Sequence, residues 1–479
     1  MRGFLASSIA SSVGVACATA LVLPLTLPAT AATARPAPAG ARSAPAAGRP
    51  DLPGSTQSLP LAPLTRNRAI GFGAVAEQGL TRQDVRHFSM VGVIWDNPDT
   101  KLHGHVQVRT RATGNGTWSG WQSLETHNDD AADPDTAERT SGRVRGSTAP
   151  LWVGDSDGVE VRVRAEGGSG TEAAAPSTRA VAAASALPSG LRLELVDPGD
   201  EAPAEDAPPV ALHGMPAEAP PAGALAAESA ESLAASTANA DLAPLGATEI
   251  PALSRAATER ELQTLRGSEL TKAQRAKPYI GPRPRIITRR GWGANEKLRE
   301  KGFVYTKKVK AAFVHHTASG NGYKCSQAAS VIRGIYRYHV KSMGWRDIGY
   351  NFLVDKCGNI YEGRAGGVAK AVFGAHTLGF NTNSMGIAVL GTFGSSKPPA
   401  AALKAISRIT AWKLGLYGAN PRGKTYLKSG GGNLYRKGKN VRLNVISGHR
   451  DGFATDCPGT QLYRKLGTAR STAARYQGR

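Results

Sequence analysis

The chain has 479 residues, more than one ordinary hydrophobic core organises, so we expect two or three domains. Its net charge of +22 is uneven: residues 281–479 contain 35 Lys and Arg against 7 Asp and Glu, which gives +28 and leaves −6 for the first 280 residues. A basic C-terminal region indicates an acidic partner, but the sequence has no zinc-finger or ribonucleoprotein motif, which argues against nucleic acid. A basic surface that serves only solubility is the alternative.

Residues 1–34 have the layout of a secretory signal peptide. Arg2 precedes an apolar run, Val13–Leu27, and small residues follow from Ala29 to Ala34 with an Ala-x-Ala cleavage pattern. Two prolines interrupt the run, which is unlike a membrane anchor, and we identify no other segment that is apolar enough to span a bilayer. We therefore expect a secreted protein with no transmembrane segment after cleavage.

Residues 35–58, rich in Ala, Pro and Arg, are predicted to be a disordered lead-in. Over residues 59–198, apolar and polar residues alternate in short runs separated by Gly and Asp clusters, which is typical of half-buried strands. The runs include Val91, Val93 and Trp95; Val106, Val108 and Thr110; Val159, Val161 and Val163; and Leu191, Leu193 and Leu195. This pattern predicts a small all-β sandwich that serves as an accessory domain.

Two features of this β domain are candidates for binding. Trp118 and Trp121 have the residue type that stacks on sugar rings, although core or strand-edge packing is the commoner role. The acidic loop Asp129–Asp135 lacks the Gly and Glu offsets of an EF-hand calcium loop, so we interpret it as a solvent-exposed loop.

Residues 199–276 are rich in Ala, Pro and Glu and poor in aromatic residues. This composition predicts a flexible linker, with some helical tendency near Ser254–Leu270.

Residues 277–479 change pattern again and predict a separate domain. Apolar runs indicate buried strands at 311–316, 385–393 and 443–447, helices at 326–341 and 400–416, and a hairpin formed by 351–354 and 359–361. Helices and strands interleave without a regular repeat, so we expect an α/β domain with a mixed β-sheet and flanking helices.

Three short segments of this domain carry metal-binding residue types. His315 ends the first predicted strand, His449 follows the last one, and Cys457 comes eight residues later. His and Cys are ligands that zinc prefers, and three protein ligands leave a fourth position open, as in catalytic zinc sites. On the pattern alone, separate buried histidines and an unrelated thiol are the alternative.

Several motifs in the same region give a resemblance to a known family. They are Arg289-Arg290-Gly291-Trp292-Gly293-Ala294, Phe313-Val314-His315-His316-Thr317, Asp347-Ile348-Gly349-Tyr350-Asn351-Phe352, Tyr361-Glu362-Gly363-Arg364, Gly374-Ala375-His376, Ser384-Met385-Gly386-Ile387-Ala388-Val389, Gly448-His449-Arg450 and Cys457-Pro458-Gly459. In this order they make residues 286–466 similar to the peptidoglycan recognition protein and bacteriophage-lysozyme-type family of N-acetylmuramoyl-L-alanine amidases. The resemblance says little about the first 280 residues.

The resemblance implies roles for individual residues. His315, His449 and Cys457 match the zinc ligands, and retention of Cys at 457 is typical of members that cut rather than only recognise. Tyr350 matches a catalytic Tyr beside the metal-bound water. Thr455 matches a position that is Lys in the phage enzyme and often Thr in recognition-type amidases. Substrate contacts are expected from a further set: His316, Arg364, His376, Asn381 and Asn383. For His316, which is not a ligand by this match, packing is the main interpretation and direct substrate contact is the alternative.

The implied reaction is hydrolysis of the lactyl amide between N-acetylmuramic acid and L-alanine of peptidoglycan, because zinc makes hydroxide available near neutral pH. Cys325 and Cys357 are then expected to form a disulfide in an oxidising compartment, with two reduced, buried thiols as the alternative. The expected location is extracellular or in the cell wall, as a monomer that binds glycan strand, stem peptide and anionic wall polymers. A peptidoglycan-recognition protein without turnover is the alternative function, and a wall-anchoring role of the β domain is a further one.

Some properties lie beyond the sequence. In many animal members Gly-Trp-Asn follows the position of Arg364, whereas Ala365-Gly366-Gly367 follows it here. The preference for diaminopimelate or lysine in the stem therefore stays open, as do the biological role of the protein and any proteolytic processing.

Overall fold

The computed structural model describes residues 54–64, 77–126, 129–166, 186–199 and 229–479. The predicted signal peptide and most of the predicted lead-in lie outside these ranges. Residues 55–58, predicted to be part of the lead-in, belong instead to the first strand, because Gln57 and its neighbours pair with the strand at Arg192–Asp197. Among the described helices, none is long and apolar enough to cross a membrane.

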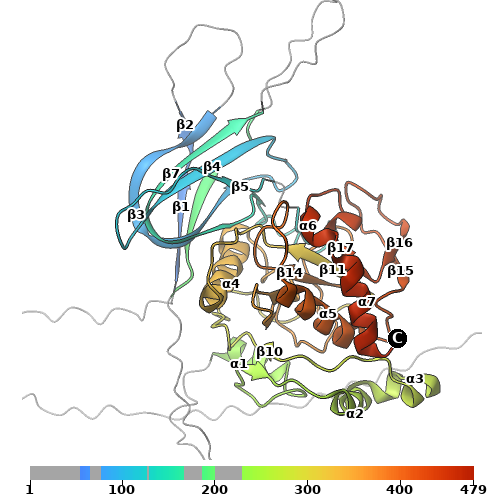
Figure 1. Ribbon diagram of the computed structural model, residues 1–479. Coiled ribbons are helices and arrows are strands. Elements are labelled where there is room, and N and C mark those ends of the chain that lie inside the picture. The colour runs from blue at the N-terminus through green and yellow to red at the C-terminus, as the bar shows by residue number, and fades with distance from the viewer. Residues whose placement is uncertain (1–53, 65–76, 127–128, 167–185, 200–228) are drawn as a thin grey trace, which may run out of the picture. The chain divides into compact units, whose positions relative to one another are not determined.

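The N-terminal described region is an all-β domain, as predicted (Figure 1). Its strands form one antiparallel sheet in the order β1-β8-β3-β7-β4-β5, with β2 and β6 paired to β3. Their bounds are β1 Ser55–Pro60, β2 Ala62–Pro63, β3 Glu77–Trp95, β4 Gly104–Ala112, β5 Gln122–Leu124, β6 Gly146–Ser147, β7 Leu151–Ala165 and β8 Arg192–Asp197. The alternating Val and Leu residues that predicted these strands are buried in one apolar cluster.

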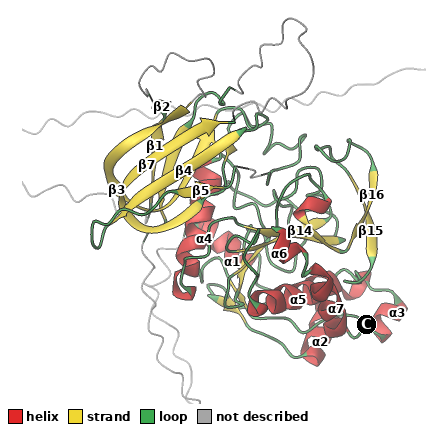
Figure 2. Cartoon of the chain, turned by 45° about the horizontal axis from the view of Figure 1, so that its top comes forward, coloured by secondary structure: helices red, strands yellow, loops and turns green. Residues whose placement is uncertain are grey.

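The C-terminal region contains a seven-stranded mixed sheet in the order β17-β11-β14-β12-β13-β10-β9. The strands are β9 Glu249–Ile250, β10 Ile286–Ile287, β11 Ala311–His316, β12 Phe352–Val354, β13 Ile360–Glu362, β14 Ser384–Val389 and β17 Ile446–Gly448. Strand β11 is parallel to both of its neighbours, β14 and β17, and all six of its residues are buried. The predicted α/β class with a mixed sheet is confirmed. Strands β15 (Lys424–Lys428) and β16 (Asn440–Asn444) form a two-stranded ribbon of their own (Figure 2).

Helices cover both faces of this sheet. Helices α5 (Ala400–Gly415) and α7 (Leu466–Gln477) lie side by side (Figure 1) and share an apolar cluster with Val354 and Ile387 of the strands. Helix α4 (Ala328–Arg337), extended by a π-helical turn to Ser342, shares another cluster with Leu353 and Ala388. Residues that are adjacent in a strand, such as Leu353 and Val354, therefore pack on opposite faces of the sheet, because successive side chains of a strand point to opposite sides. The short helix α6 (Thr460–Tyr463) precedes α7.

The cluster under α4 also includes residues of the β domain. Met90 and Val196 pack with Ile335 and Tyr338, and the Tyr338 hydroxyl donates to the backbone oxygen of Thr148 at 3.1 Å. A side chain at Gly92 would overlap the Tyr338 ring, so glycine is required for this close approach. The β domain and the α/β domain therefore share part of one core.

The stretch 199–276 differs from the predicted linker, because it is folded from Ser229 onward. It contains α1 (Ala230–Thr237), β9, α2 (Arg255–Arg266), a 3₁₀ turn (Gly267–Glu269) and α3 (Lys272–Ala276). These elements have few apolar residues, but Ile250 and Leu262 are buried in the core of the α/β domain. Tertiary packing rather than intrinsic propensity holds such short helices.

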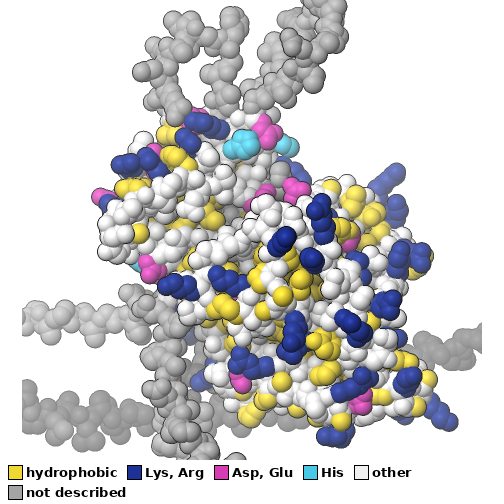
Figure 3. Space-filling view, in the orientation of Figure 1, with side chains coloured by type: hydrophobic (Ala, Val, Ile, Leu, Met, Phe, Trp, Pro, Cys, Tyr) yellow, Lys and Arg dark blue, Asp and Glu magenta, His cyan; other side chains and the backbone are white. Residues whose placement is uncertain are grey.

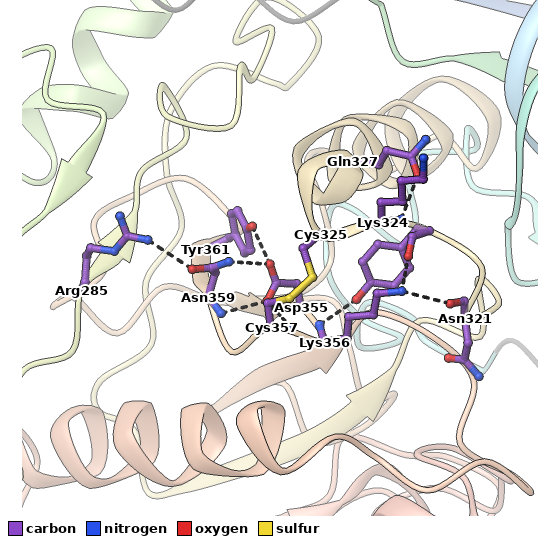
Figure 4. Close-up of a disulfide and its surroundings, with 11 residues drawn as sticks. Arg285, Asn321, Lys324, Cys325, Gln327, Asp355, Lys356, Cys357, Asn359 and Tyr361 are labelled. Atoms are coloured by element: carbon purple, nitrogen blue, oxygen red, sulfur yellow. Dashed lines mark hydrogen bonds between the residues drawn. A yellow bond between two sulfur atoms is a disulfide. The ribbon is translucent and has the colours of Figure 1, made fainter.

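Cys325 and Cys357 form a disulfide with a Cα–Cα distance of 6.2 Å, which confirms the predicted pairing (Figure 4). The bond joins the start of the α4 region to the β12–β13 turn. Within that turn, Asp355 accepts hydrogen bonds from the backbone N–H groups of Cys357 and Asn359 and from the Tyr361 hydroxyl. The turn is therefore fixed by both covalent and polar contacts.

Candidate metal and substrate site

The parallel pairing of β11 with β17 brings two of the predicted metal ligands together. Val314 lies opposite Gly448 in this register, so the next residues, His315 and His449, are neighbours with ring centroids 4.5 Å apart. Cys457 follows in the loop before α6, and its Sγ lies 3.7 Å from His315 Nδ1. One ligand atom from each of the three residues lies within 4.8 Å of the others.

Burial sets the protonation of this cluster. Both histidines are fully buried, and this desolvation lowers the pKa of His315 and of His449 to about 3, so both imidazoles are neutral at physiological pH. Burial raises the pKa of the Cys457 thiol, which would lose its proton on binding a metal. Neutral imidazole and thiolate are the forms that ligate zinc.

Unpaired buried atoms test whether a metal fits here. Neither ring nitrogen of His449 has a hydrogen-bond partner among the described residues, and the same holds for Oδ1 of the nearby Asp130. Buried polar atoms of this kind are normally satisfied, and a cation here would satisfy Asp130 Oδ1 and one of the two nitrogens of His449. His315, His449 and Cys457 therefore fit a zinc ion.

Tyr350 and Thr455, the two predicted catalytic residues, both lie close to the cluster. The Tyr350 ring is buried with its centroid 5.5 Å from that of His315. The Thr455 hydroxyl accepts a hydrogen bond from the backbone N–H of Cys457 at 3.3 Å. In this structure Thr455 holds the Cys457 loop.

The five predicted substrate residues divide into two groups. The His376 ring is buried, with its centroid 5.2 Å from that of the His315 ring. The Asn381 side-chain oxygen accepts hydrogen bonds from the backbone N–H groups of His376 and Thr377. Arg364 is buried and donates to the backbone oxygen of Ile348, one residue from the Gly349-Tyr350 segment.

The other two substrate candidates are held elsewhere. The His316 ring accepts a hydrogen bond from the backbone N–H of Phe393 at 3.2 Å. Burial lowers the pKa of His316 to about 4. Asn383 accepts a hydrogen bond from the Thr306 hydroxyl at 3.0 Å and has a positive φ of 59°. These contacts give both residues a role in local structure.

The acidic loop of the β domain was interpreted wrongly as solvent-exposed. Asp130, Asp133 and Glu138 are buried, with exposed fractions of 7%, 7% and 4%. Asp130 Oδ1 lies 2.9 Å from His315 Nδ1 and 3.3 Å from His449 Nδ1. The loop is buried because it packs on the α/β domain. Local sequence periodicity does not indicate contacts between segments that are far apart in the chain. The paired alanines at 131 and 132 are the local sign of burial.

The tryptophans of the β domain are partly covered. Arg82 and Arg109 stack over the Trp118 ring at 4.9 and 5.7 Å from its centroid, and Arg162 lies 4.1 Å from the centroid of Trp121. In this arrangement the indole faces bind guanidinium groups, which is a packing role.

A cavity of about 140 Å³ borders the site and is lined in part by Asp130, Trp345, Leu378 and Phe453. A larger cavity of about 400 Å³ lies between α1 and the segment Thr288–Lys297, and none of the three metal-binding candidates lines it. On the face shown in Figure 3, Lys and Arg side chains are numerous and Asp and Glu side chains are few.

Comparisons with known proteins agree with this layout. The model of the N-acetylmuramoyl-L-alanine amidase family matches residues 305–460, and that of the Rv3811 N-terminal galactose-binding domain-like family matches residues 42–185. Peptidoglycan-recognition protein SC2 of Drosophila melanogaster is 34% identical over 186 residues, which are 38% of this chain and 85% of that protein. The N-acetylmuramoyl-L-alanine amidase of Homo sapiens is 32% identical over 209 residues, which are 42% of this chain and 30% of that protein.

The chain is also similar in sequence to a protein of known structure. Peptidoglycan recognition protein-LE, in complex with tracheal cytotoxin (monomeric diaminopimelic acid-type peptidoglycan), is 32% identical; the match covers 38% of this chain and 92% of that one, with a TM-score of 0.30. Peptidoglycan-recognition protein SC2 is 34% identical and is matched over 85% of its length. The chain therefore belongs to the peptidoglycan-recognition protein and N-acetylmuramoyl-L-alanine amidase family.

Proposed function

We propose that this chain is an exported, zinc-dependent amidase that hydrolyses the lactyl amide between N-acetylmuramic acid and L-alanine in peptidoglycan. The observation that carries the proposal is the convergence of His315, His449 and Cys457 on one buried point, with Tyr350 beside them. Family membership supports either an amidase or a recognition function, and the complete ligand set favours the amidase. Export rests on the signal-peptide pattern of residues 1–34.

Each residue of the cluster would have a separate role in the hydrolysis. Zinc held by the two imidazoles and the thiolate would polarise the amide carbonyl and supply hydroxide near neutral pH. The Tyr350 hydroxyl, which points to this space, would donate to the negative charge that develops on the carbonyl oxygen. The Cys457 sulfur would serve as a ligand and not as a nucleophile, while Thr455 positions its loop.

Arg364 and Asn381 would hold the peptide stem. The Arg364 guanidinium binds the Glu138 carboxylate through two 2.8 Å hydrogen bonds, a geometry that suits a carboxylate of a peptide equally well. The Asn381 amide group donates to a carboxylate and to a backbone oxygen, which are both groups of a peptide. His376 would fix the wall of the site beside His315.

Mass spectrometry of muropeptides incubated with the full chain tests this function. The wild type is expected to release intact stem peptides with free L-alanine amino termini. Cys457→Ala should lose both zinc and cleavage, and Tyr350→Phe should keep zinc and lose on the order of 100-fold in rate. His105→Ala changes an exposed histidine of the β domain and serves as the control.

The alternative reading predicts a different result. If the wild type and the loop variants described below bind zinc and muropeptides but release no L-alanine termini, the chain is a recognition protein.

A further inference from the structure

We infer that the acidic segment Asp129–Glu138 is an intramolecular inhibitor that supplies Asp130 as a fourth metal ligand and occupies the peptide-binding residues of the same chain. The inference rests on the proposed function, because it concerns the same site. It also names the chemistry that must displace the segment, namely a peptide that carries carboxylates.

The Asp130 carboxylate lies beside both of the histidines that are candidate metal ligands. In a tetrahedral zinc site with bonds of ~2.0–2.3 Å, the ligand atoms are separated by roughly 3.3–3.7 Å. Asp130 Oδ1 lies 2.9 and 3.3 Å from the two histidine Nδ1 atoms, and Cys457 Sγ lies 3.7 Å from the first of them. A catalytic zinc site keeps its fourth position open, so a carboxylate there closes it.

The same aspartate engages the proposed catalytic tyrosine. The Tyr350 hydroxyl donates to Asp130 Oδ2 at 2.5 Å. One carboxylate thus holds both the open coordination position and the hydroxyl that would stabilise the reacting carbonyl. With Asp130 in place, Tyr350 has its donor committed to the chain itself.

The rest of the segment covers the proposed peptide-binding residues. Glu138 makes two hydrogen bonds with Arg364, and both side chains are buried. Asp133 Oδ1 accepts the Asn381 amide at 2.7 Å and the backbone N–H of Gly379 at 2.8 Å. The backbone oxygen of Ala131 accepts a second bond from Asn381 at 2.9 Å, as a bound peptide would.

The segment is tethered at both sides within the β domain, between β5 and β6. On its N-terminal side Asp129 pairs with Lys101. On its C-terminal side Arg139 pairs with Asp99 and Arg145 pairs with Asp96, next to the end of β3. Tethering makes occupancy of the site intramolecular, so the segment competes with free substrate at a high effective concentration. A free peptide must displace it, and its apparent affinity is reduced by the fraction of molecules in which the site is open.

Two variants of the full chain separate the parts of this inference. Asp130→Ala removes the fourth ligand, and Glu138→Gln weakens the bond to Arg364 without touching the cluster. Asp135→Ala is the matched control, because Asp135 belongs to the same segment but is exposed and pairs with Lys437 at the surface.

Metal coordination gives a readout that does not depend on turnover. Each protein is loaded with cobalt(II) in place of zinc, and its visible absorption reports the ligand set. We expect a changed spectrum for Asp130→Ala and the wild-type spectrum for Glu138→Gln and Asp135→Ala. Thermal unfolding of the same samples shows whether each variant is folded.

Binding of a purified muropeptide, measured by calorimetry, reports occupancy of the site. Asp130→Ala and Glu138→Gln should bind about tenfold or more tightly than the wild type, as expected if the site is open in a tenth of molecules or fewer. Asp135→Ala should bind like the wild type. Wild-type spectrum and affinity in a folded Asp130→Ala protein would overturn the inference, and so would weaker binding by Glu138→Gln. A third outcome is that Asp130→Ala and Glu138→Gln bind the muropeptide more tightly but no protein hydrolyses it. This outcome would refute the amidase function and support the inhibitory role of the segment.

Discussion

Val314 of β11 lies opposite Gly448 of β17, and this single parallel pair sets His315 beside His449. His315 and His449 are far apart in sequence, yet each directly follows one member of the Val314–Gly448 pair. A side chain at Gly448 would overlap the Tyr463 ring, so the pairing also depends on glycine at this point. The metal site is therefore a product of strand register.

Loss of one ligand should remove the metal. We expect His449→Ala to weaken zinc binding at least about 100-fold, because loss of outer-shell partners alone costs 10–100-fold. Competition with a chelator that changes colour on binding zinc measures this. His105→Ala, on an exposed face of the β domain, should retain wild-type affinity. Equal affinity of His449→Ala and the wild type would mean that the metal binds elsewhere.

Glu362 should make stability depend on pH. Burial raises the pKa of this carboxyl from its ordinary value of 4.5 to about 7, although Asn239 and the backbone N–H of Arg289 donate to it. The unfolded chain therefore loses this proton first as pH rises, and stability falls between about pH 4.5 and 7 by roughly 3 kcal/mol.

Denaturant unfolding at several pH values measures this effect. Glu362→Gln carries no proton in this range, so the decline should be smaller in this variant by the stated amount. Parallel curves for the two proteins would show that Glu362 is ionised at pH 5 in the folded state.

The disulfide should stabilise the α/β domain. Cys325 and Cys357 are 32 residues apart, and closing a loop of this length contributes about 3–4 kcal/mol in the chain-entropy model. The double variant Cys325→Ala with Cys357→Ala should unfold at lower denaturant concentration by that free energy. The zinc content should stay at the wild-type level, since neither residue belongs to the metal cluster. A change of less than about 1 kcal/mol would contradict the expectation.

A buried ion network around Arg289 should be sensitive to truncation. The guanidinium bonds Glu296 at 2.6 Å and Asp347 at 3.1 Å, and its side chain is 2% exposed. Arg289→Ala leaves Asp347 without its cationic partner and Glu296 with Arg299 alone, which costs about 3–5 kcal/mol. The matched control is Arg285→Ala, which breaks an exposed pair with Glu249 and should cost less than about 1 kcal/mol. Chemical denaturation of both variants distinguishes these values.

The sequence predicted those parts of the fold in which local pattern and burial coincide. Strand β11 and helix α5 were predicted almost to the residue, because each is a long apolar run with one period. The short elements between Ser229 and Ala276 were predicted as a linker, because few apolar residues anchor them. The helical tendency predicted near Ser254–Leu270 is confirmed by α2 and the 3₁₀ turn after it. Propensity and period do not record such anchoring.

The candidate site divides in the same way. His315, His449 and Cys457 come from motifs, and motif positions transfer between relatives. Asp130 could not be predicted, because its contact with Tyr350 spans 220 residues and depends on the docking of one domain on another. Asn383 was predicted as a substrate residue from its neighbourhood; it accepts a hydrogen bond from Thr306, and its contact with substrate stays a prediction.

The shared core under α4 has a consequence for unfolding. Met90 and Val196 of the β domain pack with Ile335 and Tyr338, so neither domain can lose its structure without exposing apolar surface on the other. We therefore expect a single calorimetric transition for the two domains, although their sheets are separate. A fragment that begins at residue 277 would present the uncovered face of α4 to water and should associate with itself.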